Sequence, residues 1–133
     1  MENLFTMEMT PAQVNAITNL GLAHVGDGVY ELLCRSYLVS KGDKTVLKLH
    51  NATVELVKAP TQAKFADKLK PMLTEEELGY FRRGKNTHTH AAPKSATPRE
   101  YAKATGFETL FGALYLLGRK ERLMELFAAC MED

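Results

Sequence analysis

The chain has 133 residues, of which 45% are hydrophobic and 25% charged, and its formal net charge is +1. This length suits one domain with a real core and is too short for two ordinary ones, so we expect a single domain over residues 1–133. No apolar run approaches the roughly 20 residues that span a bilayer. The start, MENLFTMEM, has acids where a signal peptide has basic residues. We therefore expect a cytoplasmic protein with no membrane partner.

Helical signals run through the chain, and convincing strand signals are lacking. Thr10 before Pro11 predicts a helix start, because threonine is a good N-cap and proline suits the first helical position. Residues 74–77 (TEEE) and 97–100 (TPRE) have the spacing of a capping box. With apolar residues at helical spacing, these signals predict helices over residues 11–19, 21–40, 44–58, 60–70, 75–83, 98–118 and 120–131.

One segment of the chain is basic and contains no acid. Residues 81–99, FRRGKNTHTHAAPKSATPR, carry five lysines and arginines and no acid, which leaves −4 for the rest of the chain. The polar stretch between Gly84 and Pro93 cannot bury enough surface to pack, so we expect a loop there. A basic segment on a mildly acidic body indicates a local contact with a polyanion.

Two acids lie nearly alone in apolar surroundings. From Met9 to Cys34 the only charged residues are Asp27 and Glu31, and from Ala104 to Gly118 the only one is Glu108. A carboxylate moved out of water costs several kcal/mol unless a partner or a metal ion compensates it. Glycines flank both acids, so close helix packing could bring the two carboxylates to one Mg²⁺ ion, a cation that prefers oxygen ligands.

Each candidate has a structural alternative. Asp27 could be a helix cap or part of a buried salt bridge, whereas Glu108 lies in mid-helix, where it caps nothing. Glu31 is four residues after Asp27 on the same helix face, and we expect a supporting or structural role for it. His88 and His90 form a pair with one residue between them, but two ligands on a loop make a poor metal site, so phosphate contact is favoured.

The basic segment suits an RNA duplex better than a single strand or a membrane. It lacks the interleaved aromatic residues that stack on single-stranded bases, and it has no apolar face to insert into lipid. Cationic side chains without stacking residues suit the phosphates of a duplex, and A-form RNA presents these across its shallow minor groove. A merely solvated basic loop remains the alternative.

The acidic segments resemble a known family. GLAHVGDGVYELLCR resembles the signature helix of ribonuclease III domains, in which a Gly-Asp step carries a metal-binding aspartate, here Asp27. ATGFETLFGALYLLG resembles the second acidic helix, whose glutamate matches Glu108. The segment RRGKN, the following loop with proline and lysine, and Tyr101 before ATGFE resemble Mini-ribonuclease III, which lacks a separate RNA-binding domain. The resemblance covers about residues 20–126.

The resemblance implies an all-α ribonuclease III-like endonuclease domain of six to seven helices. It implies a homodimeric, Mg²⁺-dependent enzyme that cuts double-stranded RNA, leaves 5′-phosphate and 3′-hydroxyl ends, and matures the 23S ribosomal RNA precursor. A large-subunit ribosomal protein is a further candidate partner. Asp27 and Glu108 are then the catalytic and metal-binding residues. The candidate RNA-binding residues are Arg82, Arg83, Lys85, Asn86 and Lys94.

Two departures from the larger ribonuclease III pattern affect the metal count. Ala23 and Thr105 stand where that pattern has acids. Mini-ribonuclease III members are similar to this chain at both positions. With only Asp27 and Glu108 matched, we expect one firmly held Mg²⁺. Two other classes remain open. A non-catalytic RNA-binding module of the same fold would conflict with the retained acid pair. An all-α nucleotide pyrophosphohydrolase would need several paired acids, whereas residues 75–77 are expected to form a helix cap.

Overall fold

The computed structural model of the chain describes residues 1–42, 45–87 and 95–132. Within these ranges it contains seven α-helices and one short 3-10 helix, and no strand, which confirms the all-α prediction. The elements are α1 (Pro11–Asn15), α2 (Asn19–Ser40), α3 (Val46–Val57), α4 (Ala59–Leu69), η1 (Lys70–Met72), α5 (Glu75–Lys85), α6 (Pro98–Leu116) and α7 (Lys120–Met131).

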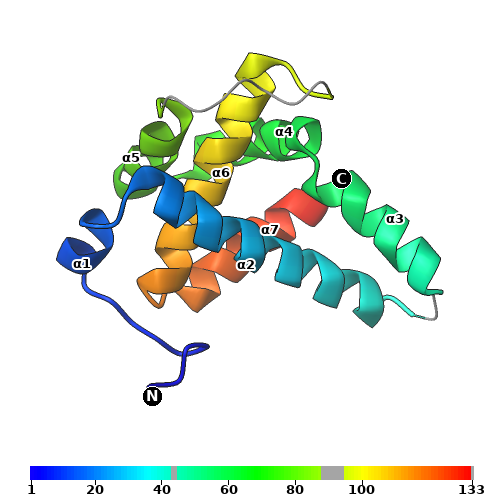
Figure 1. Cartoon of the computed structure of the whole chain (residues 1–133), viewed down its shortest axis with the longest axis horizontal. Coiled ribbons are helices and arrows are strands. Elements are labelled where there is room, and N and C mark those ends of the chain that lie inside the picture. The colour runs from blue at the N-terminus through cyan, green and yellow to red at the C-terminus, as the bar shows by residue number, and fades with distance from the viewer. Residues whose placement is uncertain (43–44, 88–94, 133) are drawn as a thin grey trace.

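Helix α6 is the centre of the fold. It runs through the middle of the molecule, α2 crosses it, and α4 and α5 also pack against it (Figure 1). Most residues between Ala104 and Leu116 are buried, on every side of the helix. A helix that is apolar all round must be covered all round, so α6 holds its neighbours in place.

Glycines allow the backbones of α2 and α6 to approach closely. A Cβ atom on Gly26 would overlap the carbonyl oxygen of Glu108, and one on Gly112 would overlap the carbonyl oxygen of Leu22. Only glycine fits where two backbones touch in this way. The contact fixes the register of the two helices that carry the acids.

Aromatic side chains fill the space beside this contact. Tyr30 meets Phe107 edge-on with ring centroids 4.9 Å apart, and Phe107 stacks on Phe111 at 4.4 Å. These geometries are favourable for aromatic pairs. The buried Tyr30 hydroxyl donates to the carbonyl oxygen of Leu56 at 2.7 Å, which joins the end of α3 to the core.

The helix starts follow the cap signals, with one correction. The capping boxes at Thr74 and Thr97 are both formed. The first helix, however, ends at Asn15 rather than at residue 19. Thr18 caps a new helix, because its hydroxyl oxygen accepts from the backbone N–H of Gly21 at 3.0 Å. The second cap turns the chain so that α2 can cross α6.

Helix α5 is longer than expected. It continues through Gly84 to Lys85, where the sequence predicted that a loop begins. Gly84 packs against α6, since a Cβ atom there would overlap the hydroxyl of Thr109. Its role is close helix packing rather than a helix stop. The rest of the predicted loop, residues 88–94, lies outside the described ranges.

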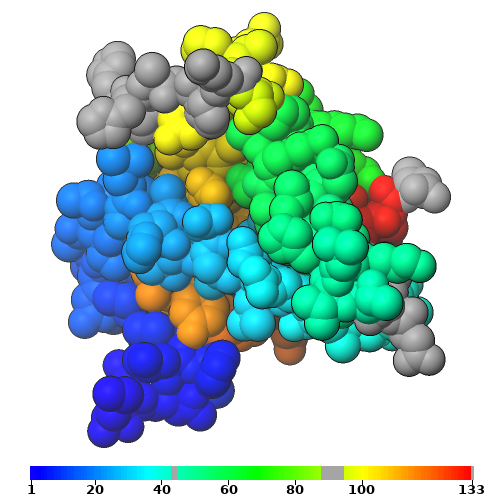
Figure 2. All heavy atoms as spheres, turned by 45° about the vertical axis from the view of Figure 1, so that its right-hand side comes forward, coloured from blue at the N-terminus to red at the C-terminus, as the bar shows by residue number. Residues whose placement is uncertain are grey.

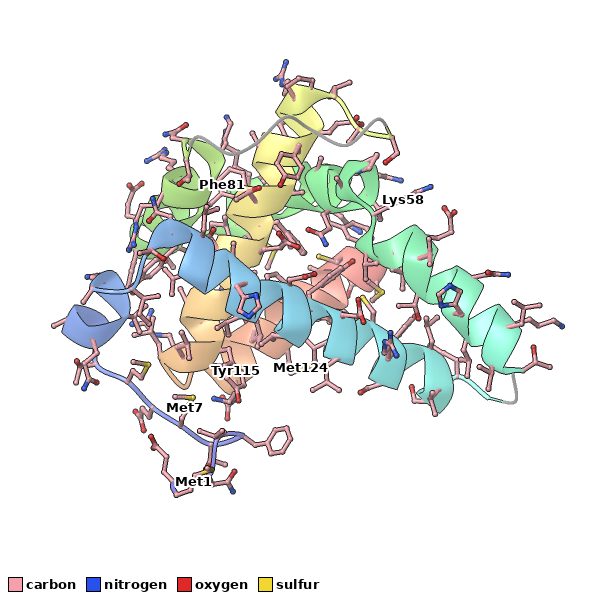
Figure 3. All side chains as sticks on the ribbon, viewed as in Figure 1. Met1, Met7, Lys58, Phe81, Tyr115 and Met124 are labelled. Carbon is pink, nitrogen blue, oxygen red and sulfur yellow. The ribbon has the colours of Figure 1, made fainter. Side chains whose placement is uncertain are left out.

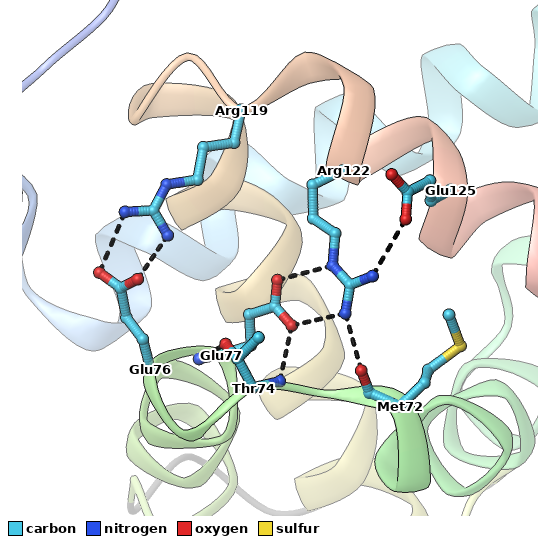
Figure 4. A network of polar contacts seen from close by, with 7 residues as sticks. All are labelled: Met72, Thr74, Glu76, Glu77, Arg119, Arg122 and Glu125. Carbon is cyan, nitrogen blue, oxygen red and sulfur yellow. Dashed lines mark hydrogen bonds and ion pairs between the residues drawn. The ribbon is translucent and has the colours of Figure 1, made fainter.

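An ion-pair network joins the start of α5 to α7 (Figure 4). Arg122 donates to both carboxylate oxygens of Glu77, at 2.8 and 2.9 Å, and to the carbonyl oxygen of Met72 at 2.7 Å. Next to it, Arg119 pairs with Glu76. Glu77 is buried, so this network satisfies a carboxylate that would otherwise be costly.

Along residues 1–42, 45–87 and 95–132, no helix is both long enough and apolar enough for a bilayer crossing.

Candidate active site

Asp27 and Glu108 meet where α2 and α6 touch. Gly26 contacts the backbone of Glu108 directly, so the neighbouring Asp27 side chain lies beside the Glu108 carboxyl group. The two acids are 81 positions apart in the sequence and come together only because of this helix crossing. In the space-filling view, part of α6, in gold, is visible at the surface between α2 and α4 (Figure 2). Asp27 is exposed, so the acid pair joins two helices at a place that solvent reaches.

Glu108 lies in an environment that disfavours its charged form. Burial, the charge of Asp27 and a hydrogen bond with Asp27 raise the pKa of Glu108 to about 8, against a smaller lowering effect of a hydrogen bond with Gln62. Burial and a nearby like charge both penalise a second negative charge. A strongly perturbed carboxyl group beside another acid is a candidate functional group.

Asp27 differs from the expectation of a buried acid. It is exposed, because it lies on the side of α2 that faces away from the core. It lies in the interior of α2, which excludes the helix-cap alternative. Within the described ranges it forms no ion pair, so a buried salt bridge is not found either. Only Glu108 of the two acids is removed from water.

Glu31 has its own partner. Its carboxylate pairs with Arg35 one turn later on α2, at 2.8 Å. Since this ion pair compensates the charge of Glu31, its structural role is the one that the structure supports. The acid pair of Asp27 and Glu108 therefore does not extend along α2 to a third acid.

The site suits a hard cation that keeps water ligands. The described ranges contain no cluster of three or more histidine, cysteine or acidic side chains that could hold a metal ion. Two carboxylates and nearby amide groups are oxygen donors of the kind that Mg²⁺ takes while it retains several waters. A cation between Asp27 and Glu108 would also remove the repulsion that raises the pKa of Glu108.

The two positions with missing acids are filled by structural residues. Ala23 is buried in α2, and Thr105 is buried in α6, where its hydroxyl donates to the carbonyl oxygen of Tyr101 at 3.0 Å. Neither side chain offers a charged ligand. The expectation of one ion at the pair of acids stays a prediction.

The basic end of α5 comes near the acids. Gly84 packs against Thr109, the residue after Glu108. Arg82 is exposed in the last turn of α5, Lys85 is half-buried, and Asn86 is an exposed helix cap. Cationic side chains are also favourable at a helix C-terminus. Lys94, His88 and His90 lie outside the described ranges, so the predictions for them stay as predictions.

Arg83 points inward, unlike its neighbour Arg82. Its guanidinium donates to the side-chain oxygen of Asn19 at 2.7 Å and to the carbonyl oxygen of Ile17 at 3.0 Å. Asn19 in turn donates to the carbonyl oxygen of Arg83 at 3.2 Å. Arg83 thus joins the end of α5 to the start of α2, a role that its place in a run of basic residues did not indicate.

Gln62 was not predicted as a site residue. This residue lies in the first turns of α4, is 1% exposed, and lies close enough to Glu108 to lower the pKa of its carboxyl group. A glutamine inside an amphipathic helix has no pattern that marks it as a site residue. It becomes visible only through the packing of α4 on α6.

Comparisons with known proteins agree with this geometry. The profile of the Ribonuclease III domain matches residues 20–119, which include both acids. The chain is 43% identical to Mini-ribonuclease 3 of Clostridium tetani over 90% of this chain and 80% of the relative. It is 46% identical to Mini-ribonuclease 3 of Symbiobacterium thermophilum over 85% of this chain and 87% of the relative. The chain belongs to the Mini-ribonuclease III family.

A solved structure supports the same fold. The crystal structure of a Fusobacterium nucleatum protein matches with a TM-score of 0.79 and 31% identity, over 87% of this chain and 93% of that one. The family makes the chain an endoribonuclease of the ribonuclease III type, and it implies a double-stranded RNA substrate. The predicted family, all-α fold and enzyme class are therefore confirmed.

Proposed function

We propose that the chain is a Mg²⁺-dependent endoribonuclease whose active site contains Asp27 and Glu108. It cuts double-stranded RNA and leaves 5′-phosphate and 3′-hydroxyl ends. The observation that carries this proposal is the half-buried carboxyl group of Glu108, whose neighbour is another acid and whose pKa is raised to about 8. Such a pair is unfavourable by itself and becomes favourable when it shares a cation.

Different residues of the chain would bind the metal ion and the RNA. Asp27 and Glu108 would hold Mg²⁺, which supplies a polarised phosphoryl oxygen and a water of lowered pKa when it is bound. Asp27 is exposed, so it can reach a phosphate that approaches from solvent. Arg82, Lys85 and Asn86 lie at the end of α5, where we propose that they contact the RNA backbone.

The proposed natural substrate is the precursor of 23S ribosomal RNA, met in the cytoplasm, with a large-subunit ribosomal protein as a candidate partner. The similarity to Mini-ribonuclease 3 proteins along most of the chain supports this proposal. Cleavage assays on a precursor stem, with and without large-subunit proteins, would test it. Equal cleavage of any duplex of the same length would contradict a specific precursor substrate.

We further propose that the chain works as a homodimer. An apolar groove of about 470 Å³ is lined by residues of α2 and α7 together with Phe5 and Tyr115, and Figure 3 labels Tyr115 and Met124 in this region. Leu32 and Met124, both in the groove, are 54% and 49% exposed. A second copy would bury this surface and give two sites related like the two strands of a duplex. Light scattering should show a dimer that Leu32→Glu disrupts, and a monomeric wild type would contradict this proposal.

Asp27→Asn tests the activity itself. The substitution keeps the size of an exposed side chain and removes the charge, so the fold and RNA binding should persist. Cleavage of duplex RNA in Mg²⁺ should fall by about 10²-fold or more. Glu31→Gln is the matched control, since it removes a neighbouring acid that pairs with Arg35. Wild-type cleavage by Asp27→Asn would contradict the proposed function.

A further inference from the structure

Gln62 holds the corner between α3 and α4 beside the acid pair. Helix α3 ends and helix α4 begins at Lys58, which Figure 3 labels. The side-chain nitrogen Nε2 of Gln62 donates to the carbonyl oxygen of Val57, the last residue of α3, at 2.9 Å. The Gln62 side chain also lies beside the carboxyl group of Glu108 on α6 and lowers the pKa of that group. One buried amide therefore connects three helices at the site.

The other end of this amide is unsatisfied. In the part of the chain that the structure describes, Oε1 of Gln62 is the one fully buried side-chain nitrogen or oxygen atom without a hydrogen-bond partner. A glutamine amide has two N–H donors, of which one bonds to Val57 while the other remains for Glu108 beside it. A buried acceptor without a donor is costly, so such an atom requires an explanation.

We propose that Gln62 is a positioning residue for the metal site. Its Nε2 orients the Glu108 carboxylate, and its Oε1 accepts a hydrogen bond from a water molecule on the bound cation. This inference rests on the proposed cation between Asp27 and Glu108. Mg²⁺ keeps several of its waters in proteins, and these need acceptors. Groups that bond to metal ligands fix their orientation and thereby raise metal affinity.

The chemistry of the side chain fits this role. A glutamate at position 62 would place a third negative charge against Glu108, whose pKa is already raised by burial and by Asp27. The neutral amide orients the carboxylate without adding repulsion and still offers an oxygen to water. A purely structural cap of α3 would need only the bond to Val57, and it would not account for Oε1.

Thr61 provides a matched control at the same corner. Its hydroxyl donates to the carbonyl oxygen of Glu55 in α3 at 2.7 Å, so it also stabilises the junction of α3 and α4. No hydrogen bond joins it to Glu108 within the described ranges. Thr61→Val therefore removes a structural bond from the corner and leaves the acid pair as it is.

The experiment is a calorimetric titration of the full chain with Mn²⁺ alone. Gln62→Met removes both polar atoms and keeps a similar volume, and we expect Mn²⁺ affinity to fall about 10- to 100-fold. Thr61→Val should lower the melting temperature at least as much as Gln62→Met does, and it should leave Mn²⁺ affinity at the wild-type value. Wild-type affinity in Gln62→Met, or an equal loss in Thr61→Val, would overturn the positioning role.

Failure of the proposed function gives a different result. If the wild-type chain shows no saturable Mn²⁺ binding, the metal site itself is overturned, and the role of Gln62 with it. A crystal structure of the wild type with Mn²⁺ tests the inference even if Gln62→Met does not fold. We expect a coordinated water within about 3.2 Å of Oε1; an Oε1 that bonds only to protein atoms would overturn the proposal.

Discussion

Two helix-borne glutamates of this protein experience opposite surroundings. Burial alone would raise the pKa of Glu77, but hydrogen bonds from Arg122 and from the backbone N–H of Thr74 outweigh it, and the net pKa is lowered. For Glu108, burial acts together with the nearby Asp27, and the pKa rises to about 8. The first carboxylate is satisfied inside the protein, whereas the second is not.

The difference separates a structural acid from a functional one. A carboxylate with an arginine partner contributes to the fold and has little capacity left for a ligand. A carboxylate next to another acid costs stability, and such a cost is typical of sites that bind charged ligands. The same contrast exists on α5, where Arg83 is bonded to Asn19 and Ile17 while Arg82 is exposed.

The largest expected effect is on the structural glutamate. Arg122→Ala leaves Glu77, which is 3% exposed, without its main partner. We expect the free energy of unfolding to fall by about 3 kcal/mol, as for other broken buried pairs. Urea denaturation measures this change. Arg119→Ala breaks a more exposed pair with Glu76, and it should lower the free energy of unfolding by less than about 1 kcal/mol. Equal losses in the two variants would contradict the special role of the buried Glu77.

Replacement of the functional glutamate, Glu108, should instead stabilise the protein at high pH. The pKa of Glu108 is higher in the folded state than the value of about 4.3 for an unfolded glutamate. The folded, metal-free protein therefore binds this proton more tightly, and stability falls as pH rises from about 4.3 towards 8. Glu108→Gln removes this loss, so at about pH 9 the variant should be more stable by about 2 kcal/mol and should not cleave RNA.

Glu77→Gln is the control for this pH dependence. The pKa of Glu77 is lowered in the folded state, so its contribution is present above about pH 4.3 and is lost as pH falls through the folded value. Its replacement should destabilise the protein at neutral pH. Urea titrations of both variants at several pH values would show the opposite signs, and a loss of stability in both would contradict our assignment of Glu108.

The smallest effect concerns the two arginines of α5. Arg82→Ala should leave stability unchanged and lower the slope of log affinity against log salt by about one unit, because one phosphate contact is lost. Arg83→Ala should destabilise the fold by about 1 kcal/mol, since it removes the bonds to Asn19 and Ile17. Filter binding at several salt concentrations tests the first expectation. An unchanged slope would remove Arg82 from the RNA interface.

The helices were predictable where local chemistry determines them. Thr74 and Thr97 begin helices through capping boxes, and both starts are as predicted. The break between the first two helices was predicted at residue 20, but it lies at residues 16–18, because Thr18 is the N-cap of α2. Gly84 was interpreted as a helix stop, but its fit against Thr109 depends on a distant helix. Local rules describe caps well and close packing poorly.

The site was predictable only in part. The isolation of Glu108 in an apolar segment correctly indicated a carboxylate partly removed from water. The same argument was wrong about the burial of Asp27, because isolation in sequence does not tell which face of a helix is covered. The inward orientation of Arg83 and the position of Gln62 beside Glu108 arise from contacts between helices far apart in the sequence.

The central claim is that Asp27 and Glu108 form one cation site. Its most direct test is a calorimetric titration of wild type, Asp27→Asn and Glu108→Gln with Mn²⁺ at about pH 8, near the pKa of Glu108. Our account predicts one saturable site per chain in the wild type and no measurable binding in either variant. Wild-type binding retained by either variant would contradict it.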